Sequence, residues 1–163
     1  PAAVAPAPMP AAPSSPAPAV SMESVNWTLP PGWTAREGSG MRRATFEVAL
    51  GGTVYECSLT VLPGEAGGLE ANARRWAAQI GRTAEGPGWA QWLAATAAGT
   101  TADGAPLWIL DYSQLPGADP GAPSMLAAVV RRPHDSLFLK MVGPPGVLSE
   151  VRGAFTALAR SLR

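Results

Sequence analysis

The first 20 residues most constrain how this chain can fold, because they contain seven Pro, eight Ala and no charged side chain. Proline fixes φ and has no amide hydrogen to donate, so such a tract enters neither an α-helix nor a sheet. In an extended polyproline conformation, at about 3.1 Å per residue, it spans on the order of 60 Å. The composition changes near Val20, which predicts an arm over residues 1–22 and one folded domain over residues 23–163.

Two interpretations of this tract stay open. It has too little apolar bulk to fold alone, so it is either a disordered linker or an extended arm that a partner protein holds. A chain that begins at Pro1 also fits an export signal or lipoprotein leader removed upstream, and its apolar runs are shorter than the roughly 18 residues of a membrane helix. In the arm interpretation, the residues that contact the partner are Pro6, Pro8, Pro10, Pro13 and Pro16.

The charged and reactive residues exclude several function classes. Twelve Lys and Arg balance twelve Asp and Glu, so no bulk attraction to nucleic acid or to anionic lipid is expected. A single Cys and a single His exclude a disulfide framework and a Cys/His zinc site. The sequence has no phosphate-binding glycine loop and no serine-nucleophile motif. We therefore expect no cofactor, no metal and no enzymatic activity.

Alternating apolar residues predict two β-hairpins. Residues 41–50 and 55–61 alternate with a period of two on either side of a Gly-Gly pair, which predicts the first hairpin. Cys57 falls in phase with the apolar residues and is expected to be a buried small hydrophobe. Residues 124–130 and 137–142 are apolar runs joined by a polar turn, which predicts the second hairpin.

Apolar residues spaced by three and four predict amphipathic helices over residues 69–80 and 148–162. Residues 89–92 open a short turn or helix, and residues 107–112 read as a further strand. Two hairpins and two amphipathic helices are typical of an α+β domain, in which an antiparallel sheet is sandwiched by helices.

Several motifs give the sequence a resemblance to known proteins. They are Trp-Thr-Leu-Pro-Pro-Gly-Trp at 27–33, the run 41–46, Leu-Pro-Gly at 62–64, Ala-Gly-Gly-Leu at 66–69, Ala71-Asn72, Arg74-Arg75-Trp76 and the run 139–144. Over most of residues 27–163 the chain resembles a family of small exported bacterial proteins, many of them lipoproteins. Its order of strands and helices is similar to the PsbP-like fold, named for an extrinsic protein of photosystem II. The resemblance implies a non-catalytic binding or accessory domain outside the cytoplasm.

Six Trp residues are candidates for ligand or partner contacts, since Trp is common at interfaces. Trp76 falls on the apolar stripe of a predicted helix and is expected in the core. Trp27 and Trp33 flank a rigid Pro-Pro-Gly turn, where we expect a structural role. Trp89 and Trp92 follow a Gly-rich connection and are the pair expected to face a partner.

The polar turn of the second predicted hairpin holds three more candidate partner-binding residues, Arg131, Arg132 and His134. Arginine suits bidentate contacts with carboxylates, and a histidine in a turn is accessible. A less favoured interpretation makes His134 the general base of a hydrolase.

These observations lead to a hypothesis with one main alternative. The hypothesis is a periplasmic extrinsic subunit that docks on protein subunits of a membrane complex and stabilises it. By resemblance, the host is a photosynthetic reaction-centre assembly or another electron-transport complex. The alternative is a free lipoprotein-type binding module for a small ligand or envelope component, with Trp89, Trp92 and the loop 114–123 lining a pocket.

Overall fold

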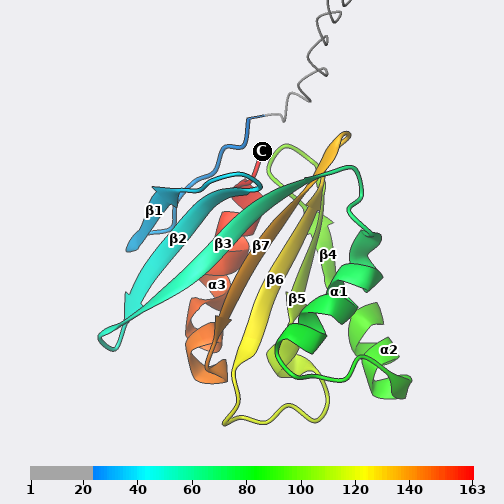
Figure 1. The fold of residues 1–163 in the computed structure, drawn as a ribbon. Coiled ribbons are helices and arrows are strands. Elements are labelled where there is room, and N and C mark those ends of the chain that lie inside the picture. Colours follow the sequence, from blue (N-terminus) through cyan, green and yellow to red (C-terminus); the bar gives the residue numbers. More distant parts are fainter. Residues whose placement is uncertain (1–23) are drawn as a thin grey trace, which may run out of the picture.

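The computed structural model describes residues 24–163, so the predicted arm and its partner-binding prolines lie outside the described residues. Within 24–163 the chain forms seven strands, three α-helices and a 3-10 helix (Figure 1). The strands are β1 (Trp33–Glu37), β2 (Arg42–Leu50), β3 (Thr53–Pro63), β4 (Ala97–Thr100), β5 (Pro106–Asp111), β6 (Ser124–Arg131) and β7 (Asp135–Gly143), and the helices are α1 (Gly68–Gln79), α2 (Gly86–Ala94), η1 (Tyr112–Gln114) and α3 (Pro145–Ser161).

The strands form one antiparallel sheet in the order β1-β2-β3-β7-β6-β5-β4. Both predicted hairpins are confirmed as β2–β3 and β6–β7, and they meet at the β3–β7 pair in the middle of the sheet. The two edge strands, β1 and β4, are short and were not predicted, because the exposed Ala-Ala-Gly-Thr of β4 has no alternating pattern.

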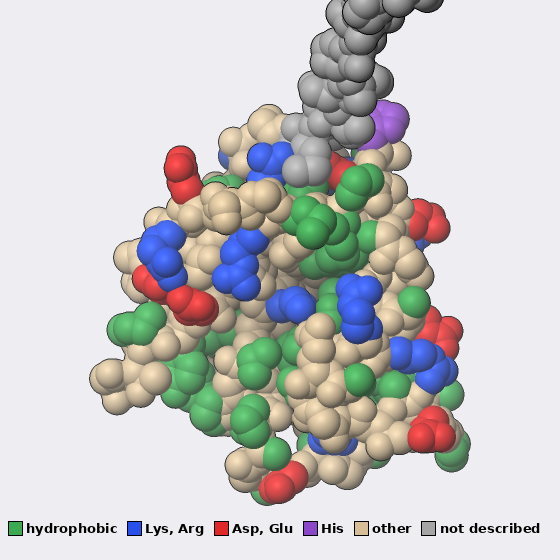
Figure 2. Space-filling view, viewed as in Figure 1, with side chains coloured by type: hydrophobic (Ala, Val, Ile, Leu, Met, Phe, Trp, Pro, Cys, Tyr) green, Lys and Arg blue, Asp and Glu red, His purple; other side chains and the backbone are tan. Residues whose placement is uncertain are grey.

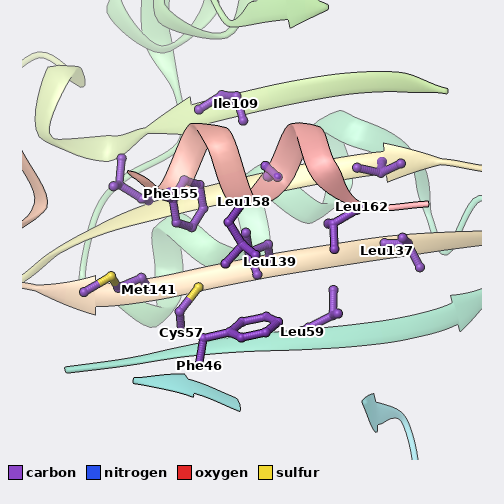
Figure 3. Packing of buried hydrophobic residues seen from close by; sticks show 14 of the residues in the cluster. Phe46, Cys57, Leu59, Ile109, Leu137, Leu139, Met141, Phe155, Leu158 and Leu162 are labelled. Atoms are coloured by element: carbon purple, nitrogen blue, oxygen red, sulfur yellow. The ribbon is translucent and has the colours of Figure 1, made fainter. Parts of the chain in front are cut away.

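Helices cover both faces of the sheet, which confirms the predicted α+β class. Helix α3 lies behind the sheet and helices α1 and α2 lie in front of it in Figure 1. Behind the sheet, α3 packs on one large apolar cluster in which Phe155 and Leu158 meet Phe46 and Leu139 (Figure 3). Cys57 belongs to this cluster and is fully buried, as predicted. Its burial raises the pKa of the thiol well above the ordinary range.

The second cluster, in front of the sheet, is smaller. Trp76 of α1 and Trp89 of α2 pack there against residues of β5, β6 and β7. Among these residues is Phe138, whose ring meets Trp76 edge to face with the ring centroids 5.4 Å apart. None of the helices in the described part of the chain lies over the front of β1, β2 and β3 (Figure 1). We call this front surface of β1–β3 the open half; its half-buried or exposed side chains include Glu47, Ala49, Val54, Glu56, Ser58 and Thr60.

The Ala-Gly-Gly and Ala-Asn motifs build the connection from β3 to α1. Ala66, Gly67 and Gly68 have φ values of 48°, 92° and 78°, a run of left-handed backbone that glycine tolerates best. The buried Asn72 holds this turn, because its Nδ2 donates to the carbonyl oxygens of Ala66 at 2.9 Å and Gly68 at 2.6 Å. Arg75 donates in turn to Oδ1 of Asn72. The motif therefore fixes where α1 begins on the sheet.

Candidate functional site

The structure separates the candidate partner-binding residues into two groups. Arg131, Arg132 and His134 belong to the β6–β7 turn, at the end of the sheet where the C-terminus lies (Figure 1). Trp89 and Trp92 belong to α2, and the loop 114–123 lies at the opposite end of the sheet (Figure 1).

The beginning and the end of the described chain meet at the β6–β7 turn. Asn26 and Arg163 exchange two backbone hydrogen bonds, of 2.7 and 3.1 Å. Arg132 donates through Nη1 to the carbonyl oxygen of Ser24 at 3.2 Å. Because Ser24 is the first described residue, the predicted arm joins the domain at this end.

An open hollow of about 1080 Å³ lies at this end, and we call it the arm-side hollow. Its charged lining residues, Glu65, Asp103, Arg131, Arg132 and Arg163, come from four parts of the chain. Thr101 donates through its hydroxyl to Asp103, and this hydrogen bond lowers the pKa of the Asp103 carboxyl. The hollow therefore presents both signs of charge at neutral pH.

The two arginines of the turn have different surroundings. Arg132 forms a bidentate ion pair with Asp135, with both N–O distances 2.6 Å and the two side chains only 7% and 6% exposed. This pair fixes the turn, so Arg132 is not the open surface contact that the sequence suggested. Arg131 is half-exposed, with its guanidinium 5.3 Å from the Trp108 ring centroid and 3.4 Å from the Glu65 carboxylate.

His134 lies exposed at the tip of the same turn, where its backbone oxygen accepts from the amide of Gly64 at 2.9 Å. Its exposure agrees with a residue available to a partner. Within residues 24–163 there is no group of three or more Cys, His, Asp and Glu side chains that would hold a metal ion. The non-catalytic interpretation and the hydrolase alternative both stay predictions.

The two Trp residues of α2 differ in their exposure. Trp89 is only 4% exposed and fills the front cluster, so it does not face a partner. Trp92 is half-buried and donates through Nε1 to the carbonyl oxygen of Asp111 at 3.0 Å. With Gln114 and Pro116, Trp92 lines an open hollow of about 410 Å³ beside the Arg152–Asp111 ion pair. The remaining Trp predictions are confirmed, because Trp76 and Trp33 are buried and Trp27 packs on Phe46.

Sequence reasoning found Arg131 and Arg132 of the arm-side hollow but missed its other three charged lining residues. Glu65, Asp103 and Arg163 are far apart in the chain, and no spacing rule joins them. They meet because β3 pairs with β7 and because the chain ends bond to each other. Only the polar turn of the second hairpin gave a signal in the sequence.

The fold defines an α+β domain with one antiparallel sheet between helices. No protein-family model matches the sequence, and no curated protein matches it. The solution structure of cyanobacterial PsbP (CyanoP) from Synechocystis is similar with a TM-score of 0.49 at 14% identity, over 88% of this chain and 94% of that one. The crystal structure of LpqN, involved in cell envelope biogenesis of Mycobacterium tuberculosis, is similar with a TM-score of 0.52 at 14% identity, over 85% of this chain and 82% of that one. The similarity to LpqN shows a shared fold and nothing more.

Proposed function

We propose that the chain is a non-catalytic accessory domain, exported to the periplasm, that docks on a membrane-embedded protein complex and stabilises it. The observation that carries this proposal is the meeting of Ser24, the β6–β7 turn and Arg163 around one open hollow of about 1080 Å³. The arm is attached at this end of the domain, next to the arm-side hollow. In this proposal the arm and the hollow bind the same partner. Two linked contacts of this kind raise affinity without a large interface on either one.

The charges of the arm-side hollow suit a protein surface better than a highly charged polymer. Glu65 and Asp103 stand beside Arg131 and Arg163, so the hollow offers hydrogen-bonding groups of both signs. The buried Arg132–Asp135 pair keeps the turn in place before the partner arrives, which lowers the entropic cost of docking. Within residues 24–163 no helix is long and apolar enough to span a membrane.

The resemblance of the sequence implies a photosynthetic reaction-centre assembly or another electron-transport complex as host. LpqN acts in cell envelope biogenesis, which agrees with a role outside the cytoplasm.

Co-migration with a native complex tests the proposal. Membranes are extracted with a mild detergent and separated on a native gel, and the full chain is detected. We expect the wild-type chain to run with a large complex and the variant lacking residues 1–20 to run mostly free, with an unchanged thermal transition. A wild-type chain that runs alone would overturn the proposal.

Two matched charge reversals locate the docking surface. Glu65 is 72% exposed and lines the arm-side hollow, whereas Glu150 is exposed in α3 near the opposite end of the sheet. Glu65→Lys and Glu150→Lys change the net charge equally. We expect Glu65→Lys to weaken co-migration and Glu150→Lys to leave it unchanged.

A second candidate function is supported by the hollow that Trp92 forms with Gln114 and Pro116. An aromatic side chain with polar neighbours in an open hollow suits a small organic ligand. The test is mass spectrometry of small molecules released on denaturing the purified chain. A compound released by the wild type and absent from Trp92→Ala supports a binding module, and equal profiles exclude this hollow.

A further inference from the structure

Three cationic side chains meet beside the open half without a carboxylate partner. Arg42 comes from β2, Arg75 from α1 and Lys140 from β7, and none forms a salt bridge within residues 24–163. Lys and Arg side chains run in a row across this front surface (Figure 2). We call these three residues the cationic cluster.

A β-bulge brings Arg42 to this side of the sheet. Arg42 pairs with Thr60, but Ala44 pairs with Leu59, so Arg43 is an extra residue in β2. Strict alternation would put Arg42 on the same face as the buried Ala44. The bulge instead turns it to the front, where its Nη1 lies 3.4 Å from the hydroxyl of Thr45.

Lys140 stands at the centre of the cluster. In the register of the sheet it pairs with Ser58, and its Nζ donates to Oε1 of Gln79 at 3.3 Å. The same Nζ lies 5.6 Å from the ring centroid of Trp76. Arg75 and Gln79 are four residues apart and so lie on one face of α1. The side chains from the sheet and the helix thus point to a shared region.

This region is a hollow of about 510 Å³ with a polar part and an apolar part, and we call it the front hollow. Arg42, Glu56, Ser58, Gln79 and Lys140 form the polar part, and Arg75 lies beside it, close enough for its charge to act on Lys140. Tyr55, Met125, Val54 and Val142 line the rest. Val54 and Val142 are 58% and 47% exposed, which is unusual for large apolar side chains.

The nearest carboxylates are already paired. Arg36 binds Glu47 at 2.6 Å and Glu56 at 2.7 Å, although Glu56 borders the front hollow. Burial first, and then the charges of Arg75 and Arg42, lower the pKa of Lys140. The free protein therefore holds like charges close together, and a bound anion would relieve their repulsion.

We propose that the front hollow binds a phosphate-bearing ligand, with the phosphate on Arg42, Arg75 and Lys140 and an apolar part on Val54 and Val142. A phosphate monoester carries about −1.5 to −2 charges at pH 7 and three strong acceptor oxygens, which match three cations better than a single carboxylate does. The concave site suits a discrete group that enters it. This site does not depend on the proposed docking, which uses the arm-side hollow.

Inorganic phosphate is the first probe. The thermal midpoint and the heat of binding of the full chain are measured in phosphate and in chloride at equal ionic strength. We expect phosphate to bind and to raise the midpoint above its value in chloride. Lys140→Gln keeps a polar side chain without the charge and is expected to weaken binding at least about tenfold, because it removes a charge-assisted hydrogen bond to the phosphate. Arg160→Gln removes the same charge from the exposed surface of α3, on the other side of the sheet, and is expected to bind like the wild type.

Vesicle binding distinguishes two sources of the phosphate, a lipid headgroup and a soluble organic phosphate. Flotation with vesicles of phosphatidic acid in phosphatidylcholine, lost in Lys140→Gln, assigns the phosphate to a lipid. Phosphate binding that depends on Lys140 without flotation assigns it to a soluble ligand. The proposal is overturned when neither phosphate binding nor flotation depends on Lys140, or when only an acidic peptide binds to this region.

Discussion

The two faces of the sheet differ in how completely helices cover them. Behind the sheet, the 17-residue α3 packs on a cluster that reaches from β1 to β5, and its inward side chains Leu148, Phe155 and Leu158 are fully buried. In front, α1 and α2 have 12 and 9 residues and cover the strands β5–β7. The back face therefore stabilises the fold, while the open half of the front face is available to a ligand.

The difference follows from the connections between elements. The turn held by Asn72 starts α1 directly after β3, and α2 and β4 then continue toward the far edge of the sheet. No element of residues 24–163 returns over β1 and β2 in front (Figure 1). Polar side chains on the open half keep this uncovered surface from being an apolar patch.

The largest change in the free energy of unfolding is expected from a core substitution on the back face, which we compare with one on the front face. Phe155→Ala empties a fully buried position behind the sheet and is expected to lower the free energy of unfolding by about 3–5 kcal/mol. Val54→Ala, at an exposed position of the open half, is expected to change it by less than about 0.5 kcal/mol. Urea unfolding of both variants measures this contrast, and equal losses would contradict the division of the two faces.

The second largest loss of stability is expected at Gly38, which lies close to the bulge in β2. A Cβ added at Gly38 would lie 1.9 Å from the carbonyl oxygen of Arg42, so the backbone of the bulge must move in Gly38→Ala. We expect a loss of about 1–3 kcal/mol, together with weaker phosphate binding because Arg42 is displaced.

Gly153→Ala is the matched control. A Cβ at Gly153 meets no atom within 4 Å, and the residue lies inside α3. We expect this variant to gain about 0.5–1 kcal/mol from helix propensity and to bind phosphate like the wild type. Unfolding curves that show no loss in Gly38→Ala would contradict the close contact.

The smallest expected change is a pH dependence of the folding stability, which arises from Cys57 on the back face. Burial raises the pKa of Cys57 in the folded chain, whereas the unfolded thiol ionises near its ordinary value of 9.0. Above that pH the unfolded state loses the proton first, so stability falls as pH rises. We expect the stability of the wild type relative to Cys57→Ala to fall by about 1 kcal/mol between pH 9 and pH 10. A difference that stays constant with pH would show that the thiol is accessible in the folded state.

Periodicity in the sequence was enough to predict both hairpins, α1 and α3, because each buries one regular face. It did not predict β4, whose exposed side chains carry no pattern. The Gly-rich connection before Trp89 suggested a surface position for this residue, although neighbouring elements bury it. Arg42 shows most clearly what periodicity cannot predict. The direction of its side chain depends on the bulge and on the close approach of Gly38, and neither is visible in the spacing of apolar residues.

The central claim is that the front hollow, beside the open half, binds a phosphate-bearing ligand while the back face does not. Amide chemical shifts of the ¹⁵N-labelled full chain, recorded as inorganic phosphate replaces chloride at constant ionic strength, test it most directly. Saturable shifts concentrated at Arg42, Ser58, Gln79 and Lys140, and absent along α3, are the predicted result. Shifts spread evenly over exposed arginines, or confined to the back of the sheet, would contradict the claim.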